Sequence, residues 1–463
     1  MTGATAESGS FRDRRGRVFY VNGRVLRTVM PIARDDFEYV RSTGLIDQLV
    51  SSGTLVAESR VDPQVLGDAG DGASIVLEHP RLEFISYPYE WSFSGLKAAA
   101  LLHLDLQIAA LAQGVMLADA SAYNVQFVGS KPIFIDHLSF RRYADGEYWA
   151  AHRQFCEQFV NPLLLRAVHG VPHNAWYRGS VEGISAEDLS KLLPWRSGLS
   201  WNILTNVWMQ ARLQRAAPSG RAIERAKAKR LPRIGLEHIL RSLRNWIAGL
   251  EPKSKDKSVW QDYALENSYS SAEASAKRAF VADFSAAINP ALIIDIGCNT
   301  GDFAAVALDN GAKLAIGFDF DHGALEHAFQ RSRAEAMNFL PLHLDAANPS
   351  PDQGWMQNER QGLQRRAKGD AVIALALAHH LVIGKNLPLD QVLSWLVAIA
   401  PRGVIEFVPK SDPMVQRLLQ MREDLFDDYE QSSFEDLLAA RARIEKSTQI
   451  SASGRRLYWF DRA

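Results

Sequence analysis

The stretch Ala291-Leu-Ile-Ile-Asp295-Ile-Gly297-Cys-Asn-Thr-Gly301-Asp decides the fold of the C-terminal half of this chain. The apolar run before Gly297 predicts a strand buried on both faces, as strands of parallel sheets are. The two glycines allow a tight turn and a close approach of the backbone to a ligand. The residues that follow predict a helix whose first N–H groups face that ligand. Because the spacing is D-x-G-x-x-x-G, it departs from the G-x-G-x-x-G of dinucleotide sites. The stretch therefore indicates a site for another nucleotide-type cofactor.

Acidic residues end the next two predicted strands. Residues 313–319 end in Asp319, where a carboxylate can accept hydrogen bonds from both hydroxyls of a ribose. Residues 338–345 end in Asp345, which is placed to accept a hydrogen bond from an adenine amino group. The carboxyl ends of parallel strands lie at one edge of a sheet, so we expect both acids near the Gly297 turn.

Further strands complete the predicted sheet. The fourth runs into His379 and His380, the fifth contains Glu406, and the last two flank a Ser-Ala-Ser-Gly turn as an antiparallel hairpin. These strands are predicted at residues 370–377, 403–409, 442–450 and 455–460.

This ordered set resembles the class I S-adenosylmethionine (SAM) methyltransferases over residues 259–463. The resemblance implies an α/β, Rossmann-like fold with a mostly parallel seven-stranded sheet that ends in an antiparallel hairpin. It also implies SAM as the cofactor. A helix that opens at Ser271 leads into the sheet, and in this class it lies over the cofactor. The cofactor-binding residues implied are Lys277, Asp295, Gly297, Cys298, Asn299, Gly301, Asp319, Phe320, Asp345 and Ala346.

For some of these side chains a purely structural role is the alternative to a role in binding or catalysis. The resemblance implies that Tyr269 and Lys277 contact the methionine carboxylate, whereas an exposed lysine on a helix would have no such role. Methyl transfer needs an aligned acceptor, and a base if the acceptor is a hydroxyl. His379 and His380 suit that base because histidine titrates near neutral pH, although at least one of them is expected to bond only to backbone. Glu406 is the alternative base or orienting residue.

The N-terminal half has a different organisation. An Asn22-Gly23 turn predicts a hairpin within residues 18–29. A helix is then expected at 35–51 and a long helix at 91–113. Between the helices, strands are predicted at residues 54–58, 73–78 and 82–87. A small β-rich lobe followed by a helical lobe is the order of a protein-kinase-like fold, here an α+β domain.

Three polar residues have kinase-like spacing after the long helix. Asp119 and Asn124 reproduce the D-x-x-x-x-N of a kinase catalytic loop, and Asp136 ends a predicted hairpin where kinases carry a magnesium-binding acid. The segment 15–210 thus resembles the kinase and aminoglycoside-phosphotransferase superfamily. It lacks a glycine-rich loop, its first lysine is Lys97, and Arg27 stands in the slot of the strand lysine. The alternatives are an active phosphotransferase, a degenerate module that binds a ligand or regulates, and acids that only stabilise turns.

The expected organisation has four parts. They are a disordered N-terminus at 1–16, a degenerate kinase-like domain at 17–211, a basic helical connector and hinge at 212–258, and the methyltransferase domain at 259–463. The connector includes the basic run 225–230 and an amphipathic helix at 234–250. Such a run attracts anionic substrates or is simply solvated.

Composition narrows the classes of protein. Of the 463 residues 47% are hydrophobic and the net charge is −1, so a folded protein is expected and nucleic acid is not the expected partner. The two cysteines lie far apart, which suits a reducing compartment and gives no zinc spacing, and no metal is expected. Without a secretory signal or a membrane-spanning run, the expected location is the cytoplasm.

Both halves together resemble the NoeA-like bacterial nodulation methyltransferases with an N-terminal kinase-like module. The resemblance implies a small-molecule or glycan acceptor and O-methylation of a saccharide or another polyhydroxylated molecule. A bifunctional kinase-methyltransferase and a non-catalytic ligand-binding protein are the alternatives. The identity of the acceptor and the oligomeric state stay open.

Overall fold

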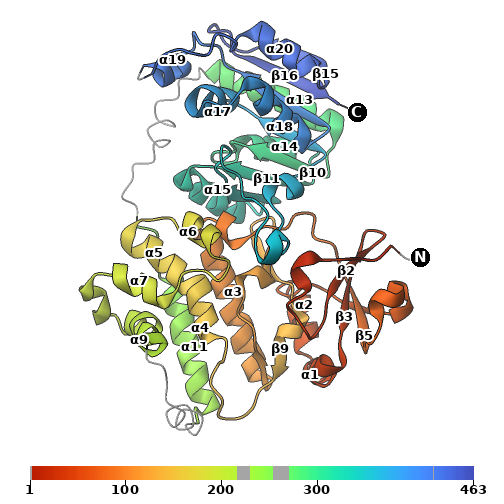
Figure 1. The fold of residues 1–463 in the computed structure, drawn as a ribbon, viewed down its shortest axis with the longest axis vertical. Helices are drawn as coiled ribbons and strands as arrows, with labels where there is room; N and C mark the ends of the chain where they lie inside the picture. The colour runs from red at the N-terminus through yellow and green to blue at the C-terminus, as the bar shows by residue number, and fades with distance from the viewer. Residues whose placement is uncertain (1–2, 216–229, 254–270, 421, 463) are drawn as a thin grey trace. The chain divides into compact units, whose positions relative to one another are not determined.

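The computed structural model describes residues 3–215, 230–253, 271–420 and 422–462 (Figure 1). Residues 225–229 of the basic run, residues 254–258 of the expected hinge, and Tyr269 lie outside these ranges. The chain forms two compact units. The first comprises Met1–Phe127, Pro132–Lys255 and Asp352–Arg360, and the second comprises Val128–Lys131, Asp256–Pro351 and Gln361–Ala463. Two short segments therefore belong to the unit built from the other half of the chain, which the expected domain limits did not foresee.

The second unit is built on a seven-stranded sheet in the order β12-β11-β10-β13-β14-β16-β15. The pairs from β12 to β14 are parallel, and β16 runs antiparallel between β14 and β15. The strands are β10 Leu292–Ile296, β11 Leu314–Asp319, β12 Phe339–His343, β13 Ala371–Ala374, β14 Arg402–Phe407, β15 Arg443–Gln449 and β16 Arg456–Asp461. The predicted Rossmann-like sheet with a terminal antiparallel hairpin is confirmed.

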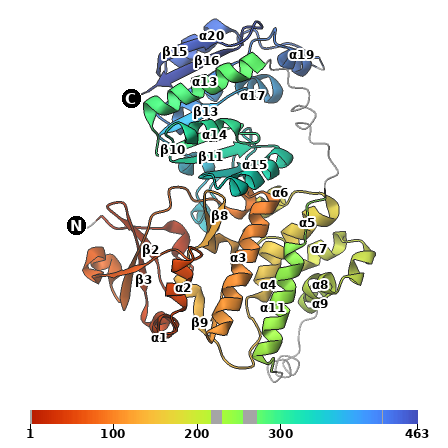
Figure 2. The same ribbon diagram turned by 180° about the vertical axis from the view of Figure 1, so that it is seen from behind.

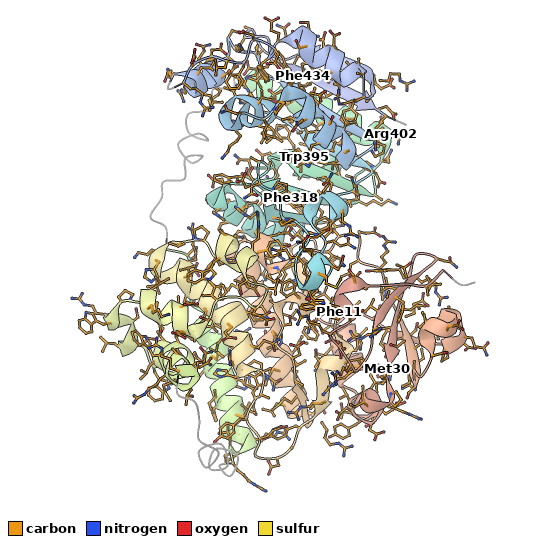
Figure 3. All side chains as sticks on the ribbon, viewed as in Figure 1. Phe11, Met30, Phe318, Trp395, Arg402 and Phe434 are labelled. Carbon is orange, nitrogen blue, oxygen red and sulfur yellow. The ribbon has the colours of Figure 1, made fainter. Side chains whose placement is uncertain are left out.

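Helices cover both faces of this sheet, as the opposite views of Figures 1 and 2 show for α13 on one face and α17 and α18 on the other. The helices are α13 Ser271–Ile288, α14 Asp302–Asp309, α15 His322–Ala334, α16 Leu363–Arg366, α17 Ala378–Lys385, α18 Leu389–Ile399, α19 Pro413–Leu419 and α20 Gln431–Ala439. Apolar side chains between the layers form the core. Phe318 of β11 and Phe434 of α20, labelled in Figure 3, are both buried. Because the central strands are buried on both faces, they read as apolar runs in the sequence.

The first unit opens with a five-stranded sheet in the order β1-β2-β3-β5-β4. The β2–β3 hairpin is confirmed, with positive φ at Asn22 (50°) and Gly23 (80°), as a two-residue turn between right-twisted strands requires. The strands are β1 Thr5–Ala6, β2 Val18–Val21, β3 Arg24–Val29, β4 Ser59–Val61, β5 Ile75–His79, β6 Val115–Leu117, β7 Val125–Val128, β8 Lys131–Phe134 and β9 Phe140–Arg142. The last four form two separate pairs, β6 with β9 and β7 with β8.

Four expectations for the first unit are wrong. The strand expected at 54–58 is replaced by an isolated bridge of Leu55 with Phe134, and β4 begins only at Ser59. The segment 3–16 is not a disordered tail, because β1 pairs with β2 and Asp13 bonds to Arg27. The single helix expected at 35–51 is two helices, separated at Gly44, which has a φ of 76°. No strand forms at 82–87, where the backbone of Ser86 bonds to the side chain of Gln126 instead.

The helices of the first unit are α1 Pro31–Ser42, α2 Leu45–Ser51, α3 Phe93–Ala112, α4 His152–Phe155, α5 Asn161–His169, α6 Asn174–Gly179, α7 Ala186–Leu192, α8 Trp201–Ile203, α9 Met209–Arg215 and α11 Arg233–Ala248. Helices α1 and α2 lie between β3 and β4 in the chain, and the other helices follow β5. Helix α11 packs on α3 and buries Leu236, Leu240, Leu243 and Ile247, so it is part of this unit and not a connector.

Helix α3 meets the length and composition of a membrane-spanning helix, contrary to expectation. Of the most apolar 18-residue stretch of this helix, 67% is buried inside the protein. Its apolar composition is therefore explained by packing within the first unit.

Candidate cofactor and acceptor site

The glycine turn after β10 has the geometry that its sequence predicts. Gly297 and Gly301 have φ values of 84° and 81°, and Asn299 has 47°. A Cβ at Gly301 would lie 2.5 Å from the ring of Phe339, so close packing on β12 also requires glycine there. At Gly297 the nearest atoms to such a Cβ are 3.8 Å away. The first glycine therefore leaves the backbone of the turn open to a ligand.

Asp319 ends β11 directly beside this turn. One of its carboxylate oxygens accepts the backbone N–H of Asn299 at 2.8 Å, and the other accepts that of Asp321 at 2.8 Å. Burial raises the pKa of Asp319 above its usual value, although these hydrogen bonds act in the opposite direction. The predicted ribose acid is thus placed at the carboxyl edge of the sheet, in contact with the glycine turn.

Asp295 lies deeper, within β10. It is 1% exposed, and its Oδ2 has no hydrogen-bond partner among the described residues. Burial, together with the nearby Asp319 and Asp302, raises the pKa of Asp295 to about 8. The carboxyl group is therefore mostly protonated at neutral pH, and its Oδ2 is a buried polar atom in the strand that precedes the Gly297 turn.

Phe320 and Asp345 extend the same edge. The Phe320 side chain is 63% exposed, which makes its ring available for stacking. Asp345 follows β12 and accepts the backbone N–H of Ala347 at 3.1 Å, and both it and Ala346 are half-buried. Cys298 is different, because its buried thiol packs against Gly317 and burial raises its pKa well above the usual value. Cys298 therefore contributes packing and not a reactive side chain.

Four buried charges lie together near the ends of β14 and β16. Lys277 of α13 donates to Glu406 Oε2 at 2.7 Å, and Arg455 lies 3.5 Å from Glu406 Oε1. Arg455 also binds both carboxylate oxygens of Asp412, at 2.6 and 2.7 Å. All four residues are at most 2% exposed. Lys277 is therefore not an exposed helix lysine, and its ammonium is engaged by a carboxylate of the protein itself.

This network anchors the loop that leads to His379 and His380. Glu406 Oε2 also accepts the backbone N–H of Ala376 at 2.9 Å, and Ala376 has an unusual φ of 50°. Backbone strain of this kind persists where the surroundings hold it, often at functional sites. Glu406 is bonded to an ammonium, a guanidinium and a backbone amide, and this geometry favours anchoring over accepting a proton. Arg455 and Asp412 escaped prediction because each looks like an ordinary turn residue in the sequence.

His379 and His380 begin α17 with their ring centroids 4.2 Å apart. His379 is 1% exposed, and neither of its ring nitrogens has a hydrogen-bond partner among the described residues. Burial, with His380, Arg455 and Lys277 nearby, holds the pKa of His379 well below its usual value. Burial and Arg455 lower the pKa of His380 to about 4. Both imidazoles are therefore neutral at pH 7.

The three kinase-like residues of the first unit also come together. The amide nitrogen of Asn124 lies 3.1 Å from an oxygen of Asp119 and 3.4 Å from one of Asp136. Arg27, from β3, forms a 2.7 Å ion pair with Asp136. No group of three or more histidine, cysteine or acidic side chains suited to a metal was found among the described residues.

The sheet order, the glycine turn and the edge acids define the second unit as a domain with the class I methyltransferase fold. No family model matches the chain. The nodulation protein NoeA of Rhizobium meliloti (strain 1021) is 48% identical over 458 residues, which cover 98% of this chain and 96% of that protein. The chain therefore belongs to the NoeA family.

Two methyltransferases of known structure match part of the chain. The N-methyltransferase NodS of Bradyrhizobium japonicum WM9, in complex with S-adenosyl-L-homocysteine (SAH), is 13% identical with a TM-score of 0.32, and the match covers 45% of this chain and 93% of NodS. Magnesium protoporphyrin IX methyltransferase (ChlM) of Synechocystis PCC 6803 with bound SAH is 17% identical with a TM-score of 0.29, and the match covers 41% of this chain and 84% of ChlM.

Proposed function

We propose that this protein is a SAM-dependent methyltransferase that methylates a hydroxyl of a saccharide or another polyhydroxylated molecule. The observation that carries the proposal is the contact between the glycine turn and the acid of the next strand, Asn299 N to Asp319 at 2.8 Å. The residues fit the cofactor, because the Gly297 turn is open and Asp295 holds an unpartnered oxygen in the strand that precedes it. When bound, SAM would supply an activated methyl group on its sulfonium.

In this proposal each edge residue has a separate task. Asp319 accepts hydrogen bonds from the ribose hydroxyls, Phe320 offers its exposed ring to the adenine, and Asp345 accepts from the adenine amino group. The turn residues Gly297 to Gly301 present backbone N–H groups at the start of α14. Lys277 has its ammonium bound to Glu406, so it contacts a methionine carboxylate only by sharing that ammonium.

His379 is the proposed base on the acceptor side. A buried imidazole with two unpartnered nitrogens can accept a hydrogen bond from a hydroxyl and then its proton. His380 packs on it and is the proposed structural neighbour. The NoeA relationship supports a nodulation-related product, and a polyhydroxylated acceptor is our proposal for its chemical class.

Calorimetry with SAH tests the cofactor site directly. Asp319→Ala should weaken SAH binding by about 2 to 3 kcal/mol, since two charge-assisted hydrogen bonds are lost. Asp309→Ala, which removes an exposed carboxylate at the end of α14, is the matched control and should leave the affinity unchanged. Equal affinity in both variants would refute the assignment of Asp319. Transfer of labelled methyl from SAM to a panel of oligosaccharides then tests the acceptor class.

A second function is proposed for the first unit, that of a degenerate kinase-like module that binds a ligand without rapid phosphotransfer. The convergence of Asp119, Asn124 and Asp136 supports it. Arg27 in place of the strand lysine opposes alignment of a triphosphate. Robust phosphotransfer from ATP that is lost in Asp136→Asn would contradict this proposal and favour a bifunctional enzyme.

A further inference from the structure

Arg27 reaches from β3 into the polar cluster of the first unit. Its Nη2 lies 2.7 Å from Asp136 Oδ1 and 2.9 Å from Asp13 Oδ2. The arginine is 8% exposed, and its Nε has no hydrogen-bond partner among the described residues. A buried guanidinium is thus held between a carboxylate that follows β8 and a carboxylate from the N-terminal segment.

The other contacts of Asp136 leave little room for a second cation. Its Oδ1 accepts the backbone N–H of Leu138 at 3.0 Å, and its Oδ2 accepts the hydroxyl of Ser139. Asn124 directs its amide nitrogen toward both Asp119 and Asp136. Magnesium and manganese are bound through oxygen atoms, so Asn124 would have to turn its amide oxygen into the cluster to bind such an ion.

The charges agree with this arrangement. Burial works to raise the pKa of Asp136, but the Arg27 guanidinium and the hydrogen bonds hold it below its usual value. Asp119 accepts hydrogen bonds from Asn124 and Ser121 but pairs with no guanidinium among the described residues, and burial and the neighbouring Asp136 raise its pKa. Arg27 therefore neutralises the one carboxylate that a kinase-like site would use for a metal.

We infer that Arg27 is the resident cation of this cluster and takes the place of a divalent metal at Asp136. The inference rests on the ligand-binding function proposed for the first unit, and it means that this ligand would bind without a metal ion. Removal of the guanidinium should turn the cluster into a divalent-cation site, because Asp119, Asp136 and a reoriented Asn124 would then supply oxygen ligands with no internal counter-ion.

Titration of the full chain with Mn²⁺, followed by electron paramagnetic resonance of the free ion, tests this inference. Wild type and Arg27→Lys, which keeps a cation, should show no saturable binding at the cluster. Arg27→Gln should bind Mn²⁺ at least about tenfold more tightly than wild type, and Arg27→Gln with Asp136→Asn should lose that gain. A folded Arg27→Gln variant that gains no binding would overturn the inference.

If Arg27→Gln does not fold, the melting temperature of the wild type tests the inference independently. The inference expects the melting temperature of the wild type to be the same with and without millimolar Mn²⁺. It is overturned if Mn²⁺ raises that temperature and the increase disappears in Asp136→Asn, because the ion then binds Asp136 despite Arg27. Circular dichroism of each variant establishes that it is folded.

Discussion

The ammonium of Lys277 lies 2.7 Å from the carboxylate of Glu406, and both side chains are almost completely buried. This ion pair links α13 to the end of β14. Glu406 also accepts the backbone N–H of Ala376 at 2.9 Å, so the pair fixes the loop that precedes His379 and His380. A buried pair is costly to desolvate, but the loss of only one partner is worse, because it leaves an uncompensated charge in the interior.

Glu406→Gln should therefore destabilise the protein by about 3 to 5 kcal/mol in urea unfolding, since Lys277 loses its counter-charge. Asp283→Asn is the matched control, because Asp283 also lies on α13 but forms a largely exposed pair with Lys446 at 3.0 Å. That change should cost less than about 1 kcal/mol. In a double-mutant cycle, Lys277→Met should restore part of the stability that Glu406→Gln loses. A similar loss of unfolding free energy in the Glu406 and Asp283 variants would show that the buried pair does not stabilise the protein more than an exposed pair does.

Asp295→Asn should change how stability depends on pH in the absence of a cofactor. The folded-state pKa of Asp295 is about 8, against a reference value of 3.8. Between these values the folded state keeps a proton that the unfolded state releases, so wild type loses stability as pH rises, by up to about 1.4 kcal/mol per pH unit. The asparagine variant lacks this loss. The free energy of unfolding of the variant minus that of the wild type should therefore rise with pH until about pH 8 and then stay constant. Asp309→Asn, at an exposed site, should show no such trend.

The sequence predicts the second unit well because its signals are local. Apolar runs, a glycine turn and acids at strand ends depend on a few consecutive residues, and the parallel sheet brings them to one edge. The charged network around Glu406 is not local. Lys277 and Arg455 come from a helix and a turn far apart in the chain, and a single lysine on a helix looks like a surface residue.

The same distinction explains the errors in the first unit. The N-terminal segment has the polar composition of a disordered tail, yet Asp13 binds Arg27 across the sheet, and only the tertiary structure provides that partner. The segment 82–87 has strand-like composition, but the side chain of Gln126 takes the backbone hydrogen bonds of Ser86 that a neighbouring strand would otherwise make.

Glu359→Gln should loosen the segment Asp352–Arg360, which belongs to the first unit. Glu359 accepts two short hydrogen bonds, from Arg12 at 2.6 Å and from the backbone of Trp355 at 2.7 Å. Hydrogen bonds to a charged group contribute about 1.5 to 3 kcal/mol, so amide exchange at residues 352–360 should become faster. Glu38→Gln, which breaks the exposed pair with Arg60, is the control and should leave that exchange unchanged.

Acid should have the same effect as this substitution. Burial by itself would raise the pKa of Glu359. The hydrogen bonds from Arg12 and Trp355 outweigh burial and hold this pKa below its usual value of 4.5. A depressed carboxylate pKa stabilises the folded state above the unfolded pKa, and this stability is lost as pH falls through the folded pKa. The exchange difference between wild type and Glu359→Gln should therefore narrow below about pH 4. A difference that persists in acid would mean that the charge of Glu359 is not what holds the segment.

His379 should act as the base without titrating near neutral pH. Burial and the nearby cations keep the pKa of His379 well below 6.5, and the pKa of His380 is about 4. Methyl transfer to a hydroxyl acceptor should therefore vary little between about pH 6 and 8, because both imidazoles are already neutral there. His379→Ala should lower turnover by about 10²- to 10⁴-fold while SAH affinity stays near that of wild type, since base catalysis acts on the transition state. His380→Ala should lower the melting temperature before it lowers turnover. If both histidine variants keep full turnover and Glu406→Gln is folded but inactive, Glu406 is the base; if all three are active, methyl transfer depends on alignment of the acceptor alone.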